Sequence, residues 1–129
     1  MSNRIDPDTV VPPAGPYSQA ILSEGHGRWL HVSGQIGVLP DGALAGDFSA
    51  QARATWDNLL NVLAAAGMGV ADLVEVTTYV VDPADLPALG PIRAGYLGDA
   101  RPASTLVVAA ALARPEWRIE VQAVAFQPA

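Results

Sequence analysis

The chain has 129 residues, of which 50% are apolar and 16% are charged, and its formal net charge at pH 7 is −6. A chain of this length buries about two thirds of its unfolded surface. The composition therefore predicts one globular domain over residues 1–129 and excludes a disordered or two-domain chain. There is no cysteine, and all seven basic residues are arginine. These absences exclude a thiolate nucleophile, a disulfide framework, a thiolate metal site and a lysine Schiff base.

Charge and hydropathy argue against nucleic acid and membrane as partners. The arginines are scattered along a chain with a sequence pI near 4.5, whereas nucleic-acid binding needs a clustered basic surface. The longest apolar run, at residues 106–113, is far shorter than the roughly 18 residues that span a bilayer. The N-terminus lacks an apolar targeting segment. We therefore expect a cytoplasmic protein.

The N-terminal third predicts a loop and two short strands. Residues 7–16 contain four of the eleven prolines, which favour an extended loop. Residues 17–22 and 28–33 are predicted as strands, and the Pro-Asp-Gly sequence at 40–42 is typical of a turn. The short separation of the two strands suggests that they pair as a hairpin.

The middle of the chain predicts a helix, a strand and further helical pieces. Residues 48–66 place apolar side chains at helical spacing, with Asp47 or Ser49 available as the N-cap. Residues 73–81 are rich in valine and threonine and predict a strand. Residues 82–97 begin with a helix-start pattern, but their prolines and glycines are expected to break the segment into short pieces.

The last two predicted strands have different environments. Residues 105–112 form a continuous apolar run, which predicts a strand buried on both faces, whereas residues 117–126 alternate and predict one buried face. The order β-β-α-β-α-β-β predicts a single α+β domain in which two helical segments cover one face of a mixed sheet. Because few polar residues remain for the other face, we expect another subunit to cover it.

A few side chains are suited to chemistry, although a packed tyrosine and a solvated strand face would also explain them. They are Tyr17, Ser33, Gly34, Glu120 and Gln122. A phenol on a rigid loop can orient a substrate, and a hydroxyl beside a glycine allows a ligand to approach the backbone. The two histidines supply at most half of a metal site, so no metal is expected.

Five segments occur in a fixed order along nearly the whole chain. They are Gly-Pro-Tyr-Ser-Gln-Ala at 15–20, Val-Ser-Gly-Gln-Ile at 32–36, Asn-Leu-Leu-Asn-Val-Leu-Ala-Ala-Ala-Gly at 58–67, Pro-Ala-Ser-Thr at 102–105 and Ile-Glu-Val-Gln-Ala-Val-Ala at 119–125. Together they resemble the reactive-intermediate deaminase family, of the RidA or YjgF type. The resemblance extends over about residues 14–125.

The resemblance implies a chorismate-mutase-like subunit that forms a homotrimer with a cleft between each pair of subunits. Active members of the family hydrolyse small enamines and imines, such as 2-aminoacrylate, to keto acids and ammonia without a cofactor. Carried over by position, Tyr17 would line the cleft and Ser33 and Gly34 would contact the small-molecule ligand. The segments at 102–105 and 119–122 would complete the site.

The chain departs from the family pattern at two of these positions. Active members resemble Pro-Ala-Arg-Ser, in which the arginine pairs with the substrate carboxylate, but this chain has Ser104 at that place, followed by Thr105. The glutamate that activates water corresponds to Gln122, and Glu120 matches an earlier glutamate of the same strand. Loss of both charged groups predicts weak activity on 2-imino acids.

Three questions therefore stay open at the level of sequence. Arg93 or Arg101 could replace the missing arginine; without either, neutral carbonyl compounds should bind at least as well as 2-keto acids. The chain is expected to act on a reactive imine, enamine or carbonyl compound, or else to bind a small metabolite without turnover. A ribonuclease role is disfavoured by the acidic chain without lysine.

Overall fold

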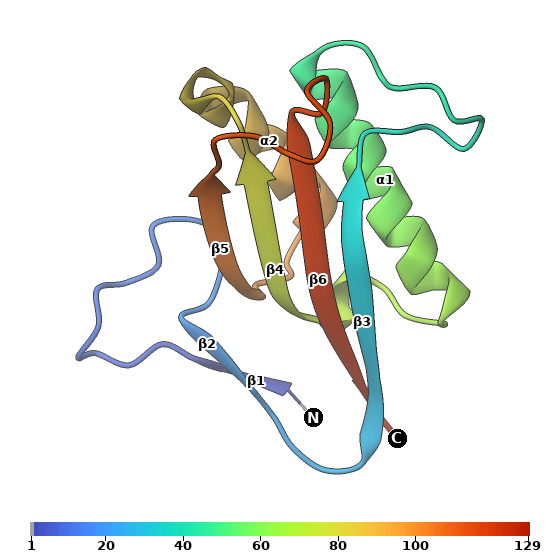
Figure 1. Cartoon of the computed structure of the whole chain (residues 1–129). Helices are drawn as coiled ribbons and strands as arrows, with labels where there is room; N and C mark the ends of the chain where they lie inside the picture. Colours follow the sequence, from blue (N-terminus) through green and yellow to red (C-terminus); the bar gives the residue numbers. More distant parts are fainter. Residues whose placement is uncertain (1) are drawn as a thin grey trace.

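The computed structural model describes residues 2–129 (Figure 1). The elements in chain order are β1 (Ser2–Ile5), β2 (Ala20–Ser23), β3 (Gly27–Ile36), α1 (Phe48–Ala65), η1 (Val70–Asp72), β4 (Leu73–Val80), η2 (Pro83–Asp85), α2 (Leu86–Leu97), β5 (Ala103–Val108) and β6 (Ile119–Pro128), where η marks a 3-10 helix. The expected order of alternating strands and helices is confirmed, with one additional strand at the N-terminus.

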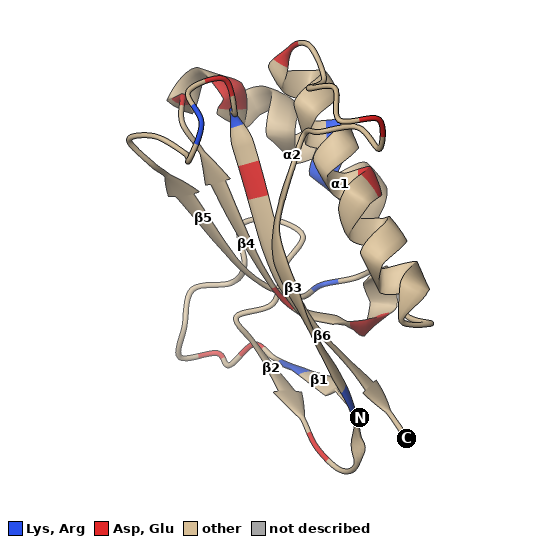
Figure 2. Ribbon diagram, turned by 45° about the vertical axis from the view of Figure 1, so that its right-hand side comes forward, with Lys and Arg blue, Asp and Glu red and all other residues tan. Residues whose placement is uncertain are grey.

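The main sheet has the strand order β3-β6-β4-β5, with β5 parallel to β4 and the other neighbours antiparallel. Both α-helices lie on one side of this sheet, and β1 and β2 form a separate ribbon at one end (Figures 1 and 2). The predicted α+β fold, a mixed sheet with helices on one face, is confirmed. We call the face opposite the helices the open face.

The core lies between the sheet and α1. Alternate residues of β6, from Ile119 to Ala125, are buried because every second side chain of a strand points to the same face. From α1, Trp56, Leu59 and Leu63 meet them and have no exposed surface. Truncation of such a leucine to alanine typically costs about 2–5 kcal/mol, so this layer fixes the sheet on which the candidate site is built.

The predicted N-terminal hairpin is wrong. β2 pairs with β1, and β3 pairs with β6 from the far end of the chain. The reason is packing: in register with β6, Val32 faces Ala123 in the core, which a four-residue hairpin partner could not provide. The strand β1 itself was not predicted.

The apolar strand β5 is also not buried on both faces as predicted. It pairs with β4 alone within residues 2–129, so it forms the edge of the sheet. Leu106, Val107 and Val108 are 42%, 37% and 46% exposed. An apolar run of this kind gives the same sequence pattern in a central strand and in an edge strand, and an exposed apolar edge calls for a partner.

The helical pieces expected after residue 82 are instead one short 3-10 helix followed by a continuous α2. Pro91 lies inside α2. A proline removes the hydrogen bond to the carbonyl four residues earlier, which here belongs to Pro87 in the first turn. The helix therefore loses one bond near its start and continues.

Candidate functional site

A bulge in β3 brings Ser33 and Gly34 beside β6. Val32 is in register with Ala123 and Gln35 with Val121, so two residues of β3 lie opposite the single residue Gln122. A bulge of this kind bends the strand and re-aims its side chains. The sequence prediction that these residues belong to one site is thus matched by their positions.

The carboxylate of Glu120 lies directly against the backbone of Gly34. A Cβ atom at position 34 would be 1.9 Å from Oε2 of Glu120, so only glycine leaves room for this arrangement. Glu120 is half-buried on β6 and forms no hydrogen bond or ion pair with residues 2–129. A carboxylate placed in this way can accept a proton from a bound water molecule.

The open face continues from Gln122 across the sheet to Thr105. Gln122 is in register with Thr77 of β4, and Thr77 is in register with Thr105 of β5. Next to this row, Glu120 is in register with Tyr79. Thr77 and Tyr79 were not singled out from the sequence, although the alternation of residues 73–80 already places them on this face.

Ser104 lies on the opposite face of the sheet. It is in register with Val76, which is 2% exposed and points into the core, so the Ser104 side chain points to the helix side. Ser104 and Gln122, the two positions that depart from the family pattern, are therefore not brought together within one chain.

Arg93 is a partly buried cation on the helix side. It lies one helical turn from both Leu89 and Leu97, which are 0% and 3% exposed, so it shares the face of α2 that packs on the sheet. Burial lowers the pKa of the Arg93 guanidinium. The guanidinium makes no hydrogen bond or ion pair with the described residues 2–129.

Arg101, by contrast, is engaged at the end of α2. Its Nη1 donates hydrogen bonds of 2.8 Å and 2.7 Å to the carbonyls of Gly98 and Ala100. These carbonyls lack helical partners, and a cation here also interacts favourably with the helix dipole. To reach a ligand, Arg101 would have to give up both bonds.

Tyr17 belongs with the β5 edge and not with Ser33 and Gly34. Its hydroxyl accepts a hydrogen bond from the backbone N–H of Ala14 at 3.2 Å. The next residue, Ser18, donates its N–H to the Pro102 carbonyl at 3.0 Å and bridges to Ala103 at the start of β5. The loop thus delivers Tyr17 to the start of the edge strand.

The sequence-predicted residues therefore form two groups. The open-face group consists of Ser33, Gly34, Thr105, Glu120 and Gln122. The edge group consists of Tyr17, Arg93, Arg101 and Ser104. Ser104 of the edge group and Gln122 of the open-face group point to opposite sides of one sheet. A site that uses both groups needs the open face of one chain and the β5 edge of another.

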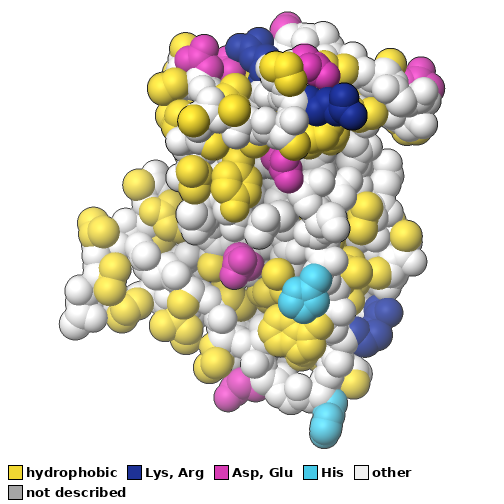
Figure 3. Space-filling model, in the orientation of Figure 1, with side chains coloured by type: hydrophobic (Ala, Val, Ile, Leu, Met, Phe, Trp, Pro, Cys, Tyr) yellow, Lys and Arg dark blue, Asp and Glu magenta, His cyan; other side chains and the backbone are white. Residues whose placement is uncertain are grey.

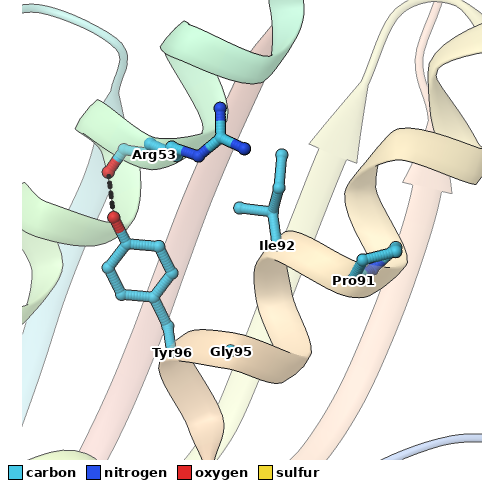
Figure 4. Close-up of a pocket in the computed structure, with 5 residues that line it drawn as sticks. All are labelled: Arg53, Pro91, Ile92, Gly95 and Tyr96. Carbon is cyan, nitrogen blue, oxygen red and sulfur yellow. Dashed lines mark hydrogen bonds between the residues drawn. The ribbon is translucent and has the colours of Figure 1, made fainter.

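A separate groove lies between α1 and α2, away from both groups (Figure 4). Its lining residues are Arg53, Pro91, Ile92, Gly95 and Tyr96. The Tyr96 hydroxyl donates to the Arg53 carbonyl at 3.2 Å and to the Asp57 carboxylate at 2.7 Å. Burial, together with the Asp57 carboxylate, raises the pKa of Tyr96 to about 12, so the phenol stays a neutral donor that ties the two helices together.

Two further classes of site were searched for in the described residues. Residues 2–129 contain no group of three or more histidine, aspartate or glutamate side chains arranged to hold a metal ion. Nor is any helix in this part of the chain long and apolar enough to cross a membrane.

Comparisons with known proteins decide the family. A family model described as endoribonuclease L-PSP matches residues 8–127. The chain belongs to this family, the RidA/YjgF type. A similar relative is the human 2-iminobutanoate/2-iminopropanoate deaminase, 34% identical over 115 residues that cover 88% of this chain and 81% of the human one. The Salmonella typhimurium protein of the same name is 33% identical over 129 residues, covering 97% and 98%.

A solved Rid family structure agrees with this assignment. The Rid protein YyfB of Yersinia pestis superposes with a TM-score of 0.85 at 38% identity, and the match covers 96% of this chain and 97% of that one. The RidA/YjgF fold expected from the five sequence segments is confirmed.

Proposed function

We propose that this Rid family chain binds a small imine or enamine in a cleft between subunits of a homotrimer and hydrolyses it to a carbonyl compound and ammonia. The observation that carries the proposal is the unpartnered Glu120 carboxylate held against the backbone of Gly34, beside Ser33. The imine deaminases of human and Salmonella among its relatives support the reaction class. No cofactor is required.

Assembly follows from the division of the candidate residues. The open-face group and the edge group come together only if the β5 edge of one copy approaches the open face of the next, and this contact would also cover the exposed Leu106, Val107 and Val108. In a ring of three copies each chain gives one edge and receives one. Light scattering should report three times the 13.4 kDa subunit mass, and a single species of 13.4 kDa would contradict the cleft.

The proposed reaction uses the open-face group for water and the edge group for the substrate. An enamine is first protonated at carbon to give the iminium ion. Water adds to the iminium carbon while Glu120 accepts its proton, and Ser33 and Gln122 orient the water through hydrogen bonds. Glu120 returns the proton to the nitrogen of the carbinolamine. The carbon–nitrogen bond then breaks, the hydroxyl becomes a carbonyl, and its proton leaves with the nitrogen as ammonium.

A second candidate is a metabolite-binding protein without turnover on the same trimeric scaffold. It is favoured by Ser104 and Gln122, since a serine cannot pair with a carboxylate as an arginine does and an amide cannot accept a proton as a carboxylate does. We do not carry over the endoribonuclease activity in the family description, because a chain with net charge −6 lacks the basic surface that RNA requires. The cytoplasmic location stays a prediction.

Hydrolysis of 2-iminobutanoate, compared among variants of the trimer, separates the two functions. If Glu120 is the base, Glu120→Gln should lower turnover by about 100-fold or more, while Glu116→Gln, which removes an exposed carboxylate before β6, should not. We expect the wild-type rate to be about tenfold or more below that of a relative with both charged residues. The double variant Ser104→Arg with Gln122→Glu should raise it. Saturable ligand binding without turnover in all variants would establish the binding protein.

A further inference from the structure

A hollow of about 480 Å³ lies on the open face at the end nearest the β1–β2 ribbon. Its walls come from β2, β3, β4, β5 and β6, and its lining residues are Gln19, Ala20, Ile21, Ser23, Trp29, His31, Val74, Glu75, Ala103 and Val124. Figure 3 shows the open face, where apolar side chains surround a histidine and an acidic residue. The only ionisable side chains in this lining are Glu75 and His31, and no arginine contributes to it.

Trp29 provides a rigid aromatic wall. Its indole packs against the Phe126 ring with centroids 4.7 Å apart and an angle of 51° between the planes. Phe126 is 3% exposed, whereas Trp29 is 54% exposed. One side of the indole is thus fixed against the protein and the other remains free, and the face of an indole attracts cations more strongly than any other side-chain ring.

Glu75 supplies the negative charge of the hollow. Glu75 of β4 and His31 of β3 are both in register with Val124 of β6, so they stand on either side of it, about 10 Å apart across three strands. Glu75 is exposed and makes no hydrogen bond or ion pair within residues 2–129. The hollow therefore has an apolar floor flanked by an uncompensated carboxylate.

Gln19 adds a second acceptor on the wall formed by the N-terminal loop. Its Nε2 donates to the Val11 carbonyl at 2.8 Å, and its own backbone N–H donates to Asp6 at 2.7 Å. Because the amide nitrogen is already engaged, the amide oxygen is the atom left to meet a ligand. Carboxylate, amide oxygen and indole face all favour the same kind of ligand, a positively charged one.

We propose that this hollow binds a small organic ammonium ion, with Glu75 opposite the charge and Trp29 against its alkyl groups. The proposal goes beyond imine hydrolysis, because it uses none of the residues assigned to that reaction and requires no turnover. It predicts selection by charge at a place where the lining is otherwise neutral and apolar.

Choline and its uncharged isostere 3,3-dimethylbutan-1-ol form a matched pair of probes. Binding is followed at pH 8, where an ordinary histidine is neutral, by the indole ¹H–¹⁵N resonance of Trp29, assigned through its loss in Trp29→Phe. The wild-type protein should bind choline about tenfold more tightly than the isostere. Glu75→Gln should reduce this preference to about twofold or less. Glu120→Gln, which removes the other carboxylate of the open face, should retain it.

Equal affinities for the two probes in the wild-type protein would overturn the proposal. So would a preference for choline that survives in Glu75→Gln. A third result would do the same: no binding of either probe together with a changed oligomeric mass for Glu75→Gln, which would show that a second copy of the chain fills the hollow. Because the readout is binding, none of these outcomes depends on whether the protein hydrolyses imines.

Discussion

Gly34 controls where the Glu120 carboxylate lies. The bulge brings the backbone of Gly34 to Glu120, and any side chain at position 34 would occupy the place of Oε2. The atom displaced is the end of a flexible side chain, so the fold should tolerate a methyl group while the carboxylate moves away from Ser33. The chemistry of the open face is therefore more sensitive to this position than the fold is.

Gly34→Ala should accordingly lower imine turnover by about tenfold or more, because a displaced base no longer meets the bound water. The melting temperature should change by only a few degrees, about the shift that 1 kcal/mol produces. Gly46→Ala is the control, since a Cβ atom at Gly46 meets nothing within 4 Å. Unaltered turnover in Gly34→Ala would show that Glu120 does not act from its observed position.

Arg93 and Arg101 differ in what they already bind, and this difference distinguishes them as ligand residues. Arg93→Ala should weaken pyruvate binding by about tenfold, the loss of one charge-assisted hydrogen bond. Arg101→Ala should leave pyruvate affinity unchanged and lower the stability of the α2 end, because its guanidinium serves the Gly98 and Ala100 carbonyls. Titrations with pyruvate and pyruvamide measure both effects. Equal affinity for the amide and the acid would favour the neutral ligand that Ser104 suggests.

At the scale of elements, Tyr96 fastens α2 to α1 and stacks on Trp56 with ring centroids 5.9 Å apart. Tyr96→Phe should cost about 1 kcal/mol of unfolding free energy at pH 8, the usual value of one hydrogen bond. Tyr79→Phe is the control, because the Tyr79 hydroxyl has no hydrogen bond within residues 2–129. Urea unfolding of the three proteins gives the comparison.

The pKa of Tyr96 also gives this contribution a defined pH dependence. The folded state holds the phenol protonated with a pKa of about 12, above the ordinary value near 10. A group with a raised pKa stabilises fully below its unfolded pKa, and the stabilisation is lost as the pH rises through the folded one. The difference between wild type and Tyr96→Phe should therefore shrink between about pH 10 and 12. A constant difference across that range would contradict the role of the phenolic proton.

Elements set by local sequence were predictable, and pairings set by distant contacts were not. The helix expected at 48–66 is observed at Phe48–Ala65, and Asp47 caps it by accepting the Ala50 N–H at 2.9 Å. Both the periodicity and the cap are local signals. The pairing of β3 with β6 joins residues nearly 100 positions apart, and nothing in residues 17–33 announces it. The same limit left β5 as an edge strand where a buried one was predicted.

The candidate site shows the same division. The resemblance to the RidA type selected Ser33, Gly34 and Glu120, and the fold does bring these three together. Two facts depended on coordinates. One is that Arg101 is engaged by backbone carbonyls, and the other is that Ser104 points away from Gln122. Side-chain direction at a strand edge follows from register, which sequence spacing alone does not determine.

At the scale of the whole molecule, each subunit is expected to offer half a site. The open face carries the base and the water-binding groups, and the β5 edge carries the arginine expected to meet the substrate. This arrangement also explains why an apolar strand remains uncovered at the edge of an otherwise well-packed sheet. The central claim is therefore that Glu120 and Arg93 of one active cleft come from different copies of the chain.

Subunit complementation tests that claim most directly. Glu120→Gln and Arg93→Ala chains are co-expressed with different affinity tags, and mixed oligomers that carry both tags are assayed for imine hydrolysis. Each homogeneous variant should be nearly inactive, whereas random mixing should restore about a quarter of wild-type turnover, because about one cleft in four receives both intact residues from adjacent copies. Mixed oligomers no more active than the average of the two parents would show that Glu120 and Arg93 act within one chain, or not together at all.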